Sequence, residues 1–174
     1  PRIPRVVIAR ELDGEGAEEV LVATDGRYIH AFEGESGGQK WRSPELDVVY
    51  PGFDRIATLD LGGTYPAVVA GSAWGDAGLT TYAADSGAVS AGPWDTALRS
   101  FAPSPDLGPP QSLVLGREDG AVLLFEPLSG TEGAVLATFP ETVEDFAFAD
   151  FDRDGTLDVA ALLPQRLEIQ DGET

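Results

Sequence analysis

The chain has 174 residues, enough for one domain with a substantial core, and its 43% hydrophobic content is ordinary for a globular protein. A formal net charge of −19 argues against nucleic-acid binding, which requires clustered positive charge, and against adsorption to anionic membranes. The absence of cysteine excludes disulfides, and no apolar run is long enough to insert into a bilayer. Because methionine is absent, we expect a mature piece or a fragment of a longer chain.

Four degenerate copies of one pattern follow one another along the chain. They begin at steps of 47, 46 and 46 residues, with "ELDGEGAEEVLVA" at Glu11, "TLDLGGTYPAVVAG" at Thr58, "SPDLGPPQSLVLG" at Ser104 and "DFDRDGTLDVAALL" at Asp150. Each start is followed by a nearly continuous apolar segment, at 20–23, 67–70, 112–115 and 159–162. Such segments are typical of strands that are buried on both faces.

This period predicts an all-β fold, a β-propeller of four repeats with four short strands in each blade. We expect blades at about 5–50, 51–97, 98–142 and 143–174, the last without its outer strand. A β-sandwich would not keep a fixed period, and β-helix repeats are shorter. Because an incomplete last blade leaves a sheet edge open, we expect the remainder of a larger propeller, or a second copy in a homodimer, to close the ring.

The turn of the last repeat carries carboxylates at alternating positions, followed by an apolar strand. Calcium takes about six to eight oxygen ligands, which short carboxylates on a tight turn can supply. The predicted ligands are Asp150, Asp152, Asp154, Asp158 and the backbone carbonyl of Thr156. Position twelve is Ala161 and a strand follows, which excludes an EF-hand. The alternative is a solvated acidic turn without metal.

The turn of the first repeat has the same spacing but uses longer side chains. Its candidate ligands are Glu11, Asp13, Glu15, Glu19 and the carbonyl of Ala17. Glutamate is one methylene longer than aspartate, so the cage fits calcium less well, and both the metal-bound and the metal-free state stay open here. The second and third repeats keep only Asp60 and Asp106 of the acidic set, and we expect no metal there.

The first and last turns resemble the calcium loops of FG-GAP/VCBS repeats, which occur in integrin-α-type propellers. The resemblance implies structural Ca²⁺ and an extracellular, cell-surface or periplasmic location, with a role in adhesion or in binding a protein or glycan. A second stretch, "ATDGRYIHAFEGESGGQKWRS", is similar to the tryptophan-docking repeat of quinoproteins. That similarity implies that Trp41 packs between blades, and no quinone cofactor site is visible.

A binding surface is predicted on the rim opposite the calcium loops, where connections between strands are rich in aromatic and acidic residues. The candidates are Tyr50, Trp74, Asp76, Trp94, Asp95 and Arg99. Aromatic faces beside carboxylates suit sugar rings or a protein hot spot. In the alternative interpretation these aromatic residues pack the loops onto the blades.

We therefore expect a non-catalytic, calcium-stabilised propeller that binds a protein or a glycan as an adhesion or scaffold module. The alternative is a propeller enzyme, such as a calcium-dependent polysaccharide lyase or a quinoprotein-like oxidoreductase. A lyase needs cationic groups near its sugar acid, whereas this chain has only 11 Lys and Arg residues. No Ser-His-Asp triad can be assembled around the single histidine, His30.

Overall fold

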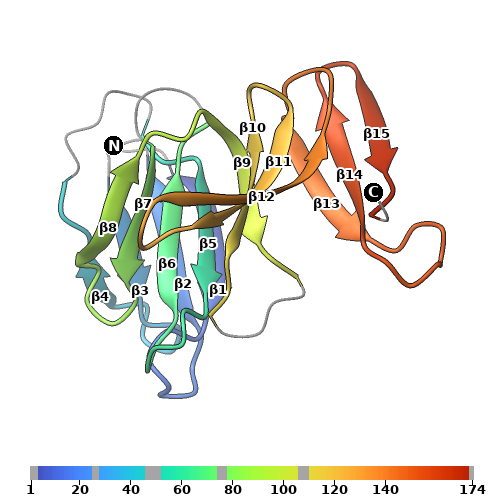
Figure 1. Ribbon diagram of the computed structural model, residues 1–174. Helices are drawn as coiled ribbons and strands as arrows, with labels where there is room; N and C mark the ends of the chain where they lie inside the picture. The colour runs from blue at the N-terminus through green and yellow to red at the C-terminus, as the bar shows by residue number, and fades with distance from the viewer. Residues whose placement is uncertain (1–3, 25–27, 46–51, 74–77, 106–109, 173–174) are drawn as a thin grey trace.

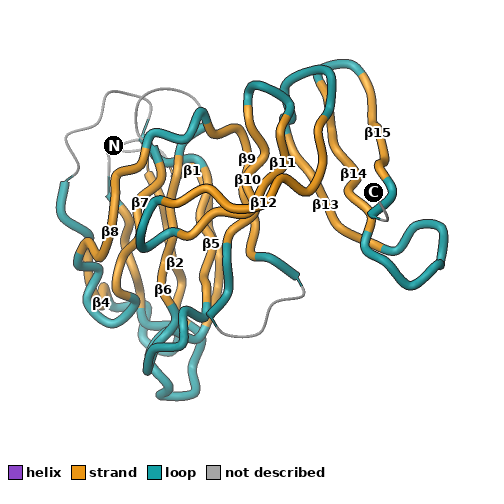
Figure 2. Tube along the Cα trace, in the orientation of Figure 1, coloured by secondary structure: helices purple, strands orange, loops and turns teal. Residues whose placement is uncertain are grey.

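The computed structural model describes residues 4–24, 28–45, 52–73, 78–105 and 110–172. Within these ranges fifteen strands form four antiparallel sheets joined by loops and turns, drawn in orange and teal in Figure 2. The same ranges contain no helix that could cross a bilayer. The all-β prediction is confirmed.

Each sheet is a meander of strands consecutive in sequence, and we name the sheets blades A to D. Blade A contains β1 (Pro4–Arg10), β2 (Glu19–Thr24), β3 (Ile29–Phe32) and β4 (Gln39–Arg42). Blade B contains β5 (Arg55–Leu59), β6 (Ala67–Gly71), β7 (Leu79–Ala83) and β8 (Val89–Trp94). Blade C contains β9 (Leu98–Pro103), β10 (Leu113–Arg117), β11 (Ala121–Glu126) and β12 (Thr131–Thr138). Blade D contains β13 (Asp145–Ala149), β14 (Asp158–Leu163) and β15 (Arg166–Gln170).

The blades stack in chain order through their first strands. β1 packs against β5, β5 against β9, and β9 against β13. Among the described residues no comparable packing joins β13 back to β1, so the four blades form an open arc with blades A and D at its ends (Figure 1). This arrangement confirms the β-propeller prediction.

Three hydrophobic clusters lie between successive blades, because alternate residues of a strand point to opposite faces of its sheet. In blade B, Val68 and Ala70 join the cluster shared with blade A, whereas Val69 joins the cluster shared with blade C. Strand β6 is consequently buried along its whole length. Strand β2, in the end blade A, alternates between buried and half-buried residues over most of its length, because blade A has a neighbour on one side only.

Two tryptophans tie one blade to the next. The Trp41 indole Nε1 donates a hydrogen bond to the Ala84 carbonyl of blade B at 2.7 Å, and the Trp94 Nε1 donates to the Pro127 carbonyl of blade C at 3.0 Å. Each ring lies against the glycine of a Ser-Gly turn: a Cβ on Gly87 would come within 2.4 Å of the Trp41 ring, and one on Gly130 within 2.7 Å of Trp94. The implied role of Trp41 is therefore seen in the structure, and Trp94 repeats it.

Candidate functional site

The acidic loops of blades A and D are equivalent turns that connect the first and second strands of their blades. Each is closed by a buried carboxylate at the start of the second strand. The Leu12 N–H donates to Glu19 Oε2 at 2.8 Å, and the Phe151 N–H donates to Asp158 Oδ2 at the same distance. We call residues 11–19 the A-loop and residues 150–158 the D-loop.

In the D-loop, backbone N–H groups fix the carboxylates in place. The Asp154 N–H donates to Asp150 Oδ1 at 3.0 Å and to Asp152 Oδ1 at 3.1 Å. Carboxylate oxygens of Asp150, Asp152 and Asp158 all lie within 4.8 Å of one another. Arg153 lies in the same loop but, within the described part of the chain, forms no ion pair with these carboxylates. An all-oxygen cluster of this kind matches the donor set that calcium prefers.

A further carboxylate, which the sequence interpretation missed, belongs to the D-loop. Oxygens of Asp152, Asp154 and Asp171 also gather within 4.8 Å. Asp171 follows β15, where the chain returns to the loop so closely that a Cβ on Gly172 would lie 2.2 Å from the Leu157 carbonyl. In the sequence, the "DG" pair at 171–172 is the feature that could have predicted this contribution of Asp171. It marks a turn in which only glycine fits, and the turn brings its aspartate to the loop.

Hydrogen bonding and charge repulsion shift the pKa values of two aspartates of this cluster in opposite directions. The backbone N–H of Asp154 lowers the pKa of Asp152, but desolvation and the neighbouring aspartates raise it, and the net pKa lies above the ordinary value. The pKa of Asp154 is lowered, because the Thr156 hydroxyl and N–H donate to its Oδ1 at 2.6 and 2.8 Å. A cation bound beside Asp152 would relieve the repulsion.

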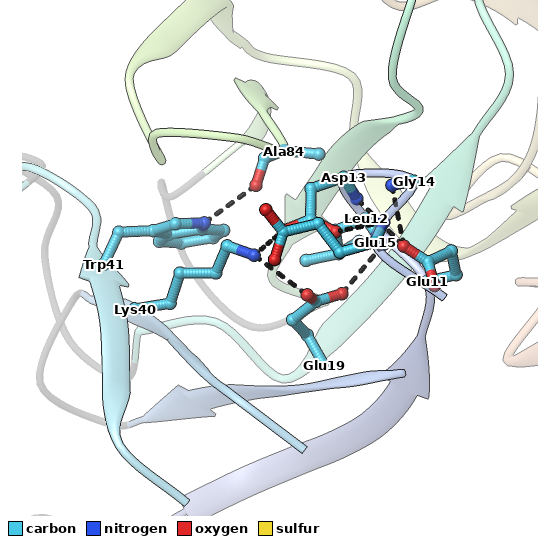
Figure 3. A network of polar contacts seen from close by, with 9 residues as sticks. All are labelled: Glu11, Leu12, Asp13, Gly14, Glu15, Glu19, Lys40, Trp41 and Ala84. Atoms are coloured by element: carbon cyan, nitrogen blue, oxygen red, sulfur yellow. Dashed lines mark hydrogen bonds and ion pairs between the residues drawn. The ribbon is translucent and has the colours of Figure 1, made fainter. Parts of the chain in front are cut away.

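In the A-loop a side chain of the protein supplies one positive charge to the carboxylates (Figure 3). Carboxylate oxygens of Glu11, Asp13 and Glu19 gather within 4.8 Å. The Nζ of Lys40, the single lysine of the chain, extends from β4, pairs with Asp13 and lies 2.9 Å from Glu19 Oε1. The Glu15 N–H donates to Asp13 Oδ1 at 3.0 Å, and the Glu15 carboxylate is not part of the group. These residues do not fit a calcium ion in this arrangement, because the ammonium already contacts two of the three carboxylates.

The corresponding turns of blades B and C are held by hydrogen bonds between the blades. The Asp60 N–H donates to Gln111 Oε1 at 2.9 Å, and the Gln111 N–H donates to the Asp60 carbonyl at 2.7 Å. The Asp60 carboxylate accepts the Gly62 N–H at 2.8 Å. Asp106 lies outside the described residues.

The residues predicted on the opposite rim serve different purposes. Tyr50, Trp74 and Asp76 lie outside the described residues. Trp94 follows the alternative interpretation, since its ring packs between blades B and C. Asp95 is exposed to solvent. The Arg99 guanidinium donates to the Ala73 carbonyl of blade B at 2.8 Å and pairs with Glu118, so it braces the rim.

Comparison with known proteins supports the fold and goes no further. No family model and no curated protein matches the sequence. Solved structures that resemble it include the computationally designed Ika4 protein, with 14% identity and a TM-score of 0.60 over 92% of this chain and 94% of that chain. BBS1N, in complex with ARL6DN, has 14% identity and a TM-score of 0.66 over 96% of this chain and 57% of its own.

A third structure, the WD40 β-propeller domain of Doa1, has 12% identity and a TM-score of 0.53 over 87% of this chain. The chain covers only 50% of that domain and 57% of BBS1N, so it spans about half the length of these propeller structures. At such low identity the likeness establishes a β-propeller fold and nothing about the ligand.

Proposed function

We propose that this chain is a non-catalytic propeller module that binds a partner protein and is stabilised by calcium in the D-loop. The observation that carries the calcium proposal is the convergence of Asp150, Asp152 and Asp158 with no cationic side chain of the described residues to neutralise them. In the equivalent A-loop the protein supplies Lys40, and this contrast supports the proposal that the D-loop takes up a cation from solution. Millimolar extracellular calcium suits such an exposed site, and an extracellular or periplasmic location is part of the proposal.

Protein binding is supported by the rigid blade stack and by the behaviour of one structural relative. BBS1N was solved as a complex with ARL6DN. On the rim opposite the calcium loops Asp95 is exposed to solvent. The sequence also predicts Tyr50, Trp74 and Asp76 for this rim, and these three lie outside the described residues. Loops carried on a rigid scaffold are the usual place for recognition, and we assign the partner to this rim. Sugar rings could also stack on its aromatic residues, so a glycan is the alternative ligand.

The calcium proposal is tested by thermal unfolding in excess EGTA and in added calcium. At a calcium concentration about one hundred times Kd, binding should stabilise the fold by about 2.7 kcal/mol, and Asp152→Ala should abolish the increase. Asp60→Ala is the matched control, because Asp60 occupies the equivalent turn of blade B without a carboxylate cluster among the described residues. Identical melting curves in EGTA and calcium for the wild type would refute calcium binding.

The rim assignment can be tested by crosslinking, because the chain has no native cysteine. Asp95→Cys and Asp60→Cys each introduce one thiol at an exposed position, on opposite rims. A photo-crosslinker attached at position 95 should capture a partner from an extracellular protein fraction, whereas the one at position 60 should not. Equal capture from both positions, or capture from position 60 alone, would contradict the assignment.

A further inference from the structure

Blade A presents a sheet face that no other described blade covers. Cross-strand pairing places Val7, Val22, His30 and Arg42 on one side of the sheet, since they lie opposite one another in turn. The other side, which carries Leu21, packs into the cluster shared with blade B. Val7 is 57% exposed, Arg42 is exposed, and Val22 and His30 are half-buried. We call this side the A-face; its main members are Val7, Val20, Val22, His30, Phe32 and Arg42.

Blade D presents a second uncovered face, at the other end of the arc. Leu162 lies opposite Asp145 and Leu167, and Ala160 lies opposite Ala147 and Ile169. Three of these apolar side chains are strongly exposed: Leu162 by 48%, Leu167 by 64% and Ile169 by 50%. Leu162 and Leu167 border a shallow apolar depression of about 280 Å³. We call this side the D-face; such a contiguous apolar surface marks an interaction site.

The repeat indicates what covers these faces. Ala160 of the D-face is equivalent to Leu21, which packs from blade A onto blade B. Val22 of the A-face is equivalent to Ala161, which packs from blade D onto blade C. The D-face therefore corresponds to a surface that receives the next blade, and the A-face to one that receives the preceding blade. A contact between a D-face and an A-face would continue the stacking already present at three junctions.

Charge favours the same pairing. The A-face has no carboxylate among its paired strand positions, although the chain carries 30 Asp and Glu residues, and it includes Arg42 and His30. On the D-face the exposed ionisable residue of the paired strand positions is Asp145, whose Oδ1 also lies 3.7 Å from Arg55 Nη1 of blade B. Joining a D-face to an A-face brings opposite charges together, whereas joining two D-faces would bring together two aspartates.

We propose that two copies of this chain close into one eight-bladed ring, with the D-face of each copy packed against the A-face of the other. Such a contact is head-to-tail, and it closes because a twofold axis generates it twice. Each copy supplies four blades, and the ring leaves neither apolar face in water. This proposal depends on blade packing alone, so it is independent of calcium binding and of a rim partner.

Light scattering coupled to size-exclusion chromatography tests the ring across a dilution series. The wild type should have twice the 18.3 kDa mass of one chain. Val7→Lys on the A-face and Leu162→Asp on the D-face should each give the mass of one chain, with unchanged far-ultraviolet circular dichroism. Val135→Lys is the matched control, because Val135 is 58% exposed on β12, outside both faces, and this variant should remain a dimer.

Mixing the two variants distinguishes a head-to-tail contact from a symmetric one. A mixed pair retains one unaltered junction, and at the other junction the introduced lysine of one chain meets the introduced aspartate of its partner. Val7→Lys and Leu162→Asp together should therefore recover dimers. A wild type with the mass of one chain at every concentration would overturn the proposal. A dimer broken by Val7→Lys but not by Leu162→Asp would also overturn it, as would assemblies larger than two copies.

Discussion

The A-loop and the D-loop have the same closing hydrogen bond but resolve their negative charge in different ways. In the A-loop an ammonium from the outer strand β4 contacts Asp13 and Glu19. Blade D has three described strands, and within them no cation pairs with the D-loop. Two loops with the same backbone hydrogen bond thus differ in whether a lysine of the same blade contacts their carboxylates. In blade A the outer strand thus supplies the counter-charge for the loop between the two inner strands.

The largest expected effect is at Lys40. Lys40→Met would leave Glu19, with a side chain only 4% exposed, and Asp13 without their counter-charge. We expect a loss of about 3 kcal/mol in the free energy of unfolding, measured by urea titration in EGTA. Calcium should restore part of this loss, because the A-loop then has the same unmet charge as the D-loop. Arg166→Met is the control: its ion pairs are exposed, and removing them should leave the free energy of unfolding nearly unchanged.

The buried closing carboxylates give the next largest effect. In the wild type the N–H groups of Phe151 and Gly172 donate to different oxygens of the Asp158 carboxylate. In Asp158→Asn only one acceptor oxygen remains for both donors. We expect a loss of about 2 kcal/mol, since hydrogen bonds to charged groups are among the stronger ones. Glu19→Gln should cost a similar amount. Calorimetric titration should separate the two: calcium binding disappears in Asp158→Asn and is unchanged in Glu19→Gln.

A difference in residue type at one left-handed position of the two loops should have a smaller effect on stability. Gly14 and Arg153 are equivalent, and both have a positive φ, of 79° and 67°. A side chain in this left-handed region costs roughly 1–2 kcal/mol, partly offset by the greater flexibility of glycine in the unfolded chain. Gly14→Ala should therefore lower the unfolding free energy by about 1 kcal/mol, and Arg153→Gly should raise it by about 0.5 kcal/mol. A thermal unfolding measurement in which Arg153→Gly lowers the stability would show that strain is absent from the D-loop.

The smallest effect concerns pH. Because the folded-state pKa of Asp152 is raised, its contribution to stability is present below its ordinary value of 3.8 and is lost as the pH rises through the raised pKa. In EGTA at neutral pH, Asp152→Asn should therefore melt a few degrees above the wild type, and this difference should shrink as the pH falls through that pKa. Saturating calcium should reverse the order at neutral pH. A difference that is independent of pH would contradict the repulsion described above.

The sequence predicted the blades and the acidic turns because both follow from local spacing. The alternation that buries β6 on both sides and the carboxylates of 150–158 lie within short segments. Lys40 was missed because it reaches Asp13 from 27 residues away, on another strand. Trp94 was assigned to the rim because the residue paired with Thr81, at the position equivalent to Trp41 in blade A, is Ala91. A register shift between β7 and β8 then places Trp94 opposite Leu79. Contacts of this kind depend on strand register, which a spacing pattern does not encode.

The interblade hydrogen bonds of Trp41 and Trp94 also predict the order in which the blades separate when the chain is pulled. Trp41 joins blade A to blade B and Trp94 joins blade B to blade C, but residues 98–174 contain no tryptophan, and blade D is linked to β12 by paired bonds between Gln170 and Thr138. A single chain pulled by its C-terminus should therefore release blade D at the lowest force, with both indoles still docked. In a Trp74→Phe variant, which keeps only Trp41 and Trp94, tryptophan fluorescence would change only at a later, stronger step, when blade C leaves Trp94.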